Sequence, residues 1–101
     1  MILVLEIDDG SLFLYPSLAE AESHLEAIDV ENGEYEFCDD TGQRFVGEIV
    51  VPVTTFQPGN FRLRPDGTPE RAVIASIVAR AHCLAKGCGE VKNLDDLRVA
   101  V

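Results

Sequence analysis

Short apolar runs alternate with turn sequences along the first half of the chain, and this alternation restricts the fold more than any other feature. The runs span residues 2–7, 12–15, 34–38 and 43–53. The sequences DDGS at residues 8–11 and DDTG at residues 39–42 separate them in pairs. Asp, Gly and Ser favour tight turns, and the runs are rich in β-branched and aromatic side chains. The sequence therefore predicts two antiparallel hairpins, with Tyr35 and Phe37 facing inward.

A helix is expected between the two hairpins. Ser17 and Glu20 form a capping box, in which the serine oxygen accepts from a backbone N–H of the first turn and Glu20 reaches back to the N–H of Ser17. Apolar residues then follow at helical spacing, at Leu18, Ala21, Leu25 and Ile28. This pattern predicts a short surface helix over residues 17–28.

A longer helix is expected toward the C-terminus. Thr68-Pro69 has the form of an N-cap followed by a first-turn proline, and Gly87 is suited to end a helix in the left-handed conformation. The apolar residues between them fall on one broad face. The sequence predicts a long C-terminal helix over residues 69–86, and Asn93 is an N-cap candidate for a short last turn.

These elements predict one α+β domain over residues 1–101. A chain of 101 residues has the length of a single domain, which is usually roughly 100–150 residues. The expected architecture is an antiparallel sheet of about four to five strands packed by one long C-terminal helix, with a short helix between the first two hairpins. A short edge strand at residues 61–64 would be the fifth strand, and the strand order stays open.

Charge is divided unevenly between the two halves of the chain. Residues 1–48 hold 13 acids and one base, a net charge of −12, whereas residues 49–101 hold five acids and seven bases, a net charge of +2. Like charges crowded into half of a small domain repel one another, so either solubility or attraction to a positive partner must account for them. The acidic balance argues against direct binding of nucleic acid and against anionic membrane surfaces.

The chain is expected to be cytoplasmic. Its start, MILVLEIDDG, has no basic leader, and no apolar stretch approaches the roughly 20 residues that span a bilayer. Three cysteines form an odd set, which fits reduced thiols in a cytosol: Cys38, Cys83 and Cys88.

The residues offer little for catalysis or metal binding. His82, Cys83 and Cys88 supply only three nearby ligand candidates, whereas a structural zinc site uses four. A calcium loop and a phosphate-binding G-x-x-x-x-G-K sequence are absent. The sequence predicts no catalytic residues, no metal and no cofactor. An enzyme would need His24 or His82 in a deep pocket beside an acid.

Six acids are the candidate partner-binding residues: Asp29, Glu31, Glu34, Glu36, Asp39 and Asp40. Glu34 and Glu36 are expected to point outward beside the turn at residues 39–42, and Asp29 and Glu31 to lie where the chain enters the same strand. One negative face would follow. Such a face steers a basic partner into encounter, over a range that salt limits to about 8 Å.

The segment Leu12 to Phe45 resembles the front half of short acidic bacterial proteins that are encoded beside polymorphic toxins and regarded as their immunity proteins. The likeness rests on a strand, a capped helix and a hairpin of the NGEYEF type. It implies a cytosolic inhibitor that binds and occludes a basic toxin domain, for which enzymes acting on nucleic acid or nucleotides are candidates. These families share no fixed functional residues. The alternative is a non-enzymatic accessory or regulatory module that homodimerises through the alanine-rich side of the helix at residues 69–86.

Overall fold

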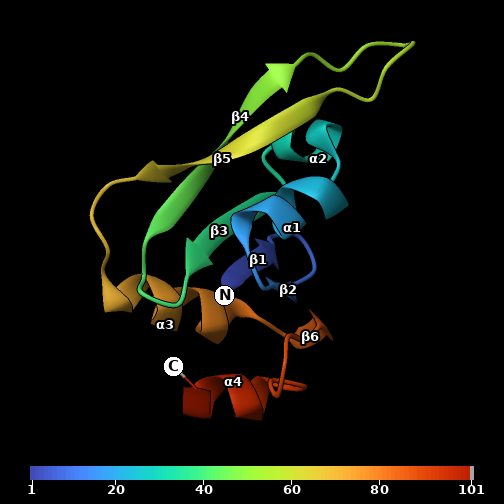
Figure 1. Ribbon diagram of the computed structural model, residues 1–101. Coiled ribbons are helices and arrows are strands. Elements are labelled where there is room, and N and C mark those ends of the chain that lie inside the picture. The colour runs from blue at the N-terminus through green and yellow to red at the C-terminus, as the bar shows by residue number, and fades with distance from the viewer. Residues whose placement is uncertain (101) are drawn as a thin grey trace.

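The structure of the protein is a computed structural model that describes residues 1–100 (Figure 1). In chain order its elements are β1 (Ile2–Glu6), β2 (Ser11–Tyr15), α1 (Leu18–His24), α2 (Ala27–Glu31), β3 (Tyr35–Asp39), β4 (Arg44–Val51), β5 (Asn60–Asp66), α3 (Arg71–Arg80), β6 (Cys83–Lys86) and α4 (Leu94–Ala100).

All six strands belong to one sheet, in the order β5-β4-β3-β1-β2-β6. β1 lies inside the sheet and pairs antiparallel with both β2 and β3. The β3–β4 and β4–β5 pairs are also antiparallel, and β6 alone runs parallel to its neighbour, β2. The two hairpins predicted from the turn sequences are confirmed.

Helices cover both faces of the sheet, because the strands alternate apolar side chains between the two faces. On one face Leu3 and Leu5 pack with α3 and with Leu97 of α4. On the other face Val4 and the strand aromatics pack with α1 and α2, and these aromatics are Tyr15, Phe37, Phe45 and Phe61. Tyr35 packs against this second core, so the inward orientation predicted for Tyr35 and Phe37 is confirmed.

The prediction of an antiparallel sheet packed by one long C-terminal helix is wrong. The sheet is mixed and six-stranded, α3 ends at Arg80, and the last helix has 7 residues. Ala81 leaves the helix with φ −74° and ψ 131°, and the N–H of His82 then donates to the carbonyl of Gly10 at 2.8 Å. Residues 83–86 contain good helix formers, but pairing with the otherwise open edge of β2 overrides that preference.

The short helix predicted over residues 17–28 is divided into α1 and α2. Leu25 has extended dihedrals, which end α1 before α2 begins at Ala27. The helix start is confirmed, since the N–H of Glu20 donates to Oγ of Ser17 at 3.2 Å. Both helices lie between the two hairpins along the chain, as the sequence predicts.

We call the hairpin of β4 and β5, residues 44–66, the arm, and its loop end projects beyond the rest of the molecule (Figure 1). β3 pairs with β4 only at Arg44 and Phe45, so the rest of β4 pairs with β5 alone. The molecule is accordingly elongated, with extents of 43 × 27 × 23 Å. The loop at residues 52–59 forms the far end of the arm.

Candidate protein-binding surface

Five carboxylates gather where the β1–β2 turn meets the segment between α2 and β3, and we call them the acidic end: Glu6, Asp8, Asp9, Asp29 and Glu34. The N–H of Ile7 donates to the carbonyl of Glu34 at 3.0 Å, which holds the turn against that segment. The register Glu6↔Tyr35 continues the same alignment. Two acidic stretches distant in sequence are therefore brought together by the pairing of β1 with β3.

The carboxylates of the acidic end repel one another. Desolvation by burial, and then Asp29, raise the pKa of Glu34. Burial, followed by Asp9, Asp29 and Asp8, raises the pKa of Glu6 in the same way. Burial, with help from Asp29, Glu6 and Glu34, raises the pKa of Tyr35 to about 12. Each shift disfavours further negative charge, as expected where carboxylates lie close without compensation.

The acids that form ion pairs within residues 1–100 lie elsewhere: Glu20, Glu36, Asp40, Glu48 and Asp95. The acidic end also includes an exposed apolar residue, because Ile7 stands between Glu6 and Asp8 in the chain and is 46% exposed. An exposed apolar residue next to charged ones has the composition of a protein interface, with its apolar centre and polar rim.

The six acids predicted from the sequence are divided by the structure. Asp29 and Glu34 lie in the acidic end, and Glu31 is exposed at the end of α2. Glu36 faces α3, where its carboxylate lies 2.5 Å from the guanidinium of Arg80. This ion pair neutralises Glu36.

The remaining two acids, Asp39 and Asp40, lie at the opposite end of β3. Asp39 Oδ1 accepts from the backbone N–H groups of Thr41 and Gln43 at 2.9 and 3.0 Å and from the Thr41 hydroxyl at 2.6 Å. Asp40 lies 3.6 Å from the N-terminal ammonium. A five-residue strand is on the order of 13 Å long, which exceeds the screening length of about 8 Å. These two acids therefore act separately from the acidic end.

The sequence reasoning missed Glu6, Asp8 and Asp9 as members of a candidate site. Asp8 and Asp9 stand in a turn sequence, where Asp is favoured for local hydrogen bonding, so their presence can be explained without a binding partner. Their role beside Asp29 and Glu34 depends on β1 lying next to β3, and the strand order was not predicted. The one feature of the sequence that indicated an acidic surface involving these residues was the excess of acids over bases in residues 1–48.

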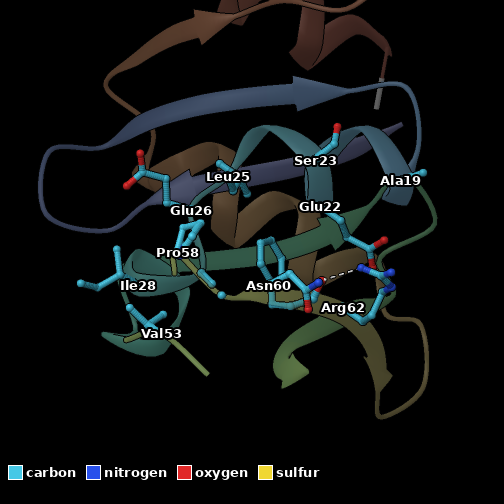
Figure 2. Close-up of a pocket in the computed structure, with 13 residues that line it drawn as sticks. Ala19, Glu22, Ser23, Leu25, Glu26, Ile28, Val53, Pro58, Asn60 and Arg62 are labelled. Atoms are coloured by element: carbon cyan, nitrogen blue, oxygen red, sulfur yellow. Dashed lines mark hydrogen bonds between the residues drawn. The ribbon is translucent and has the colours of Figure 1, made fainter. Parts of the chain in front are cut away.

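A groove of about 960 Å³ lies between the two helices α1 and α2 and the outer part of the arm (Figure 2). Apolar side chains form much of its wall, at Leu25, Ile28, Val53, Pro58 and Phe61. In Figure 2 the charged side chains of Glu22 and Arg62 lie at one end of the groove, and Ile28 and Val53 lie at the other. Glu22 Oε2 accepts from the N–H of Leu63 at 2.7 Å, which ties α1 to β5.

The alanine-rich side of α3, proposed above as a dimer surface, lies exposed at Ala72, Ala75 and Ala79. Together with Arg98 of α4 it borders a second groove of about 550 Å³. Small side chains permit close approach of another helix.

Of the histidines and cysteines, His82 and Cys83 lie beside the β1–β2 turn, at Gly10 and Ser11, next to Asp9 of the acidic end. The His24 ring stacks on Tyr15 with centroids 5.6 Å apart, and His82 packs over Gly10. All three cysteines are free thiols, and burial raises the pKa of Cys38 to about 12. Within residues 1–100 no three His, Cys, Asp or Glu side chains are grouped so as to hold a metal ion.

No helix formed by residues 1–100 has both the length and the apolar character needed to cross a membrane. Comparison of the chain with known proteins finds no protein-family model, no curated protein and no solved structure that matches it.

Proposed function

We propose that this chain is a cytoplasmic, non-enzymatic binding protein whose acidic end docks against a basic surface of a protein partner. The observation that carries the proposal is the gathering of five carboxylates beside the exposed Ile7, none of which forms an ion pair within residues 1–100. Maintaining that repulsion lowers the stability of a small domain, and a positive partner would relieve it.

The partner that fits best is a basic toxin domain. The resemblance of Leu12 to Phe45 to immunity proteins favours this class, and a basic surface is common in enzymes that bind phosphate-bearing substrates. On this proposal the acidic end attracts the toxin over long range, and Ile7 supplies apolar contact at the centre of the interface. The chain would then neutralise the toxin by covering its substrate-binding surface.

Charge reversal tests the role of the acidic end. The partner would be sought as the product of the adjacent gene, or isolated from the native cell with the chain as bait, and then purified. Asp8→Lys combined with Glu34→Lys should slow association roughly tenfold in low salt, because steering raises on-rates by about 10–10³-fold. Stopped-flow measurements at several salt concentrations should also show a flatter salt dependence.

The matched control is Glu90→Lys combined with Asp95→Lys, which changes the net charge equally but lies in the C-terminal part of the chain. Asp95 is 90% exposed at its side chain and its ion pair with Arg98 lies on the surface, so the fold should tolerate the change. Equal effects of the two double variants would mean that only net charge matters, and would remove the acidic end as the docking site. A partner that binds but keeps its full activity would exclude neutralisation.

A further inference from the structure

The end of the arm exposes a whole aromatic ring. Phe56 is 98% exposed, more than the other exposed large hydrophobic residues among residues 1–100. An aromatic side chain buries about 150–250 Å² when it is covered. Leaving one in water at the tip of a projecting hairpin is unfavourable for an isolated molecule.

The loop that carries Phe56 is held by its own hydrogen bonds. Thr54 Oγ1 accepts from the N–H groups of Phe56 and Gln57 at 3.2 and 3.1 Å, and the N–H of Thr54 donates to the carbonyl of Gln57 at 2.9 Å. Gly59, with φ 72°, closes the base of the loop, where a Cβ would lie 2.6 Å from the carbonyl oxygen of Val51. The backbone is therefore arranged with Phe56 presented outward, and Figure 1 shows the loop extending past α2.

The groove beside the arm has the complementary character. Its volume of about 960 Å³ is at the upper end of the range of roughly 300–1,000 Å³ that is typical of ligand sites. Ile28, on its wall, is 45% exposed and so is accessible to an incoming side chain. Phe56 does not line the groove of its own molecule, although Val53 and Pro58 on either side of it do.

We propose that the occupant of the groove is Phe56 of a second copy of this chain, in a reciprocal two-fold dimer. The groove lies next to the loop that carries Phe56, since Val53 and Pro58 of this loop also line the groove. A single two-fold axis beside the loop can therefore form both contacts in one closed interface, as an isologous dimer requires.

Charge complementarity favours a second copy at this surface. The arm contains three arginines and two acids, a net charge of +1, whereas residues 1–43 contain acids and no bases. In the dimer each positive arm lies along the other copy's α1–α2 side, where the groove is bordered by two acids, Glu22 and Glu26, and one base, Arg62. Approach through the arms therefore brings opposite charges together, although the chain as a whole is strongly acidic.

The proposed dimer uses residues other than the carboxylates of the acidic end. None of these five carboxylates lines the groove, although Asp29 directly follows the groove residue Ile28 in α2. A dimer could thus present two acidic ends to partners. Loss of dimerisation and loss of partner binding are separable by different substitutions.

Sedimentation equilibrium of the full chain, from micromolar to millimolar concentration, tests the dimer. We expect a monomer–dimer equilibrium for the wild type. Phe56→Ala should weaken dimerisation at least about 30-fold, as expected for an aromatic anchor in an apolar pocket. Val99→Ala, at an apolar residue of α4 that is 89% exposed, is the matched control and should leave the dimer unchanged.

Mixing two variants tests the reciprocal geometry. Phe56→Ala keeps the groove, and Ile28→Gln keeps the aromatic ring but places an amide in the groove wall. Each variant alone should be largely monomeric, whereas the mixture should form a heterodimer through one intact contact. A wild type that stays monomeric up to millimolar concentration would overturn the proposal, as would a Phe56→Ala dimer of wild-type affinity or a mixture without heterodimers.

Discussion

At the scale of single residues, the six acids chosen from the sequence differ sharply in their surroundings. Asp39 is part of a turn, Glu36 is paired with Arg80, and Glu34 faces other carboxylates. The sequence shows equal charges at these positions, and only the surrounding atoms separate them. A carboxylate that accepts several N–H bonds stabilises the fold, whereas one surrounded by like charge opposes it.

The turn formed by Asp39 gives a pH-dependent prediction. Burial acts to raise the pKa of Asp39, but the hydrogen bonds from Thr41 and Gln43 and the N-terminal ammonium outweigh it, and the pKa is lowered. The unfolded state therefore binds the proton more tightly than the folded state. The stabilisation is present in full above the unfolded pKa, near the ordinary value of 3.8, and is lost as pH falls through the folded pKa.

We expect Asp39→Asn to lower the free energy of unfolding by about 1 kcal/mol at neutral pH, since the amide oxygen still accepts but carries no charge. Urea unfolding at a series of pH values would measure the difference from wild type. The difference should shrink at the acidic end of the series, where the wild-type carboxylate is protonated. A difference that stayed constant down to the lowest pH would contradict the assignment of the charge to this turn.

At the scale of elements, local signals predicted the first five strands and the starts of α1 and α4. The predicted helix start at Thr68-Pro69 is wrong, because α3 begins at Arg71 after Glu70, which makes no side-chain cap hydrogen bond. The apolar runs and turn sequences gave both hairpins, and Ser17 caps α1 as expected. The N-cap at Asn93 is also confirmed, since its Oδ1 accepts from the N–H of Asp96 at 2.8 Å. Residues 83–86 were misassigned because their side chains suit a helix, and their partner in β2 is about 70 positions earlier in the chain. No local pattern specifies such a pairing.

A hydrogen bond between α1 and β5 adds to the strand pairing and core packing that hold the arm to the body of the protein. Glu22 of α1 accepts from the N–H of Leu63 at the outer edge of β5 at 2.7 Å. This hydrogen bond satisfies a backbone group that the sheet leaves unpaired. A hydrogen bond to a charged group contributes about 1.5–3 kcal/mol.

We expect Glu22→Ala to lower the free energy of unfolding by about 1–3 kcal/mol, and Glu22→Gln to recover part of that loss because it retains an acceptor. Chemical denaturation would give the magnitude, and hydrogen exchange at Leu63 would show whether the effect is local to β5. Glu26→Ala, at an exposed residue of the same groove, should cost less than about 0.5 kcal/mol. Equal costs at Glu22 and Glu26 would mean that the contact does not hold the arm.

At the scale of the whole molecule, the strand order determines where the charge lies. The acidic end forms because β1 lies next to β3 in the sheet. The β1–β2 turn and the segment that enters β3 therefore lie at the same end of these two strands. The charge imbalance was visible in the sequence, but its location was not. The same order leaves β4 and β5 extended past the core, and the groove beside the arm could not be predicted for the same reason.

The concentration of like charge predicts that salt stabilises this chain. With a net charge of −10, screening should reduce repulsion, since about 1 M salt shortens the screening length to about 3 Å. A gain of about 1 kcal/mol would raise the melting temperature by roughly 4–8 °C. Thermal unfolding followed by circular dichroism, in low and high sodium chloride, would measure it.

Two double variants locate the repulsion. Asp8→Asn with Glu34→Gln should raise the melting temperature in low salt and reduce its further rise with salt, because both carboxylates belong to the acidic end. Lowering the pH should have the same effect as neutralising Glu34. The pKa of Glu34 is raised in the folded state, so the folded state binds the proton more tightly than the unfolded state and gains stability as pH falls toward 4.5. Glu90→Gln with Asp95→Asn removes the same charge elsewhere and should leave most of the salt response. If both pairs reduced the response equally, repulsion would be spread over the whole surface. A larger effect of the first pair, together with weaker binding to a basic partner, would show that this fold gives up stability in order to keep its acidic end charged.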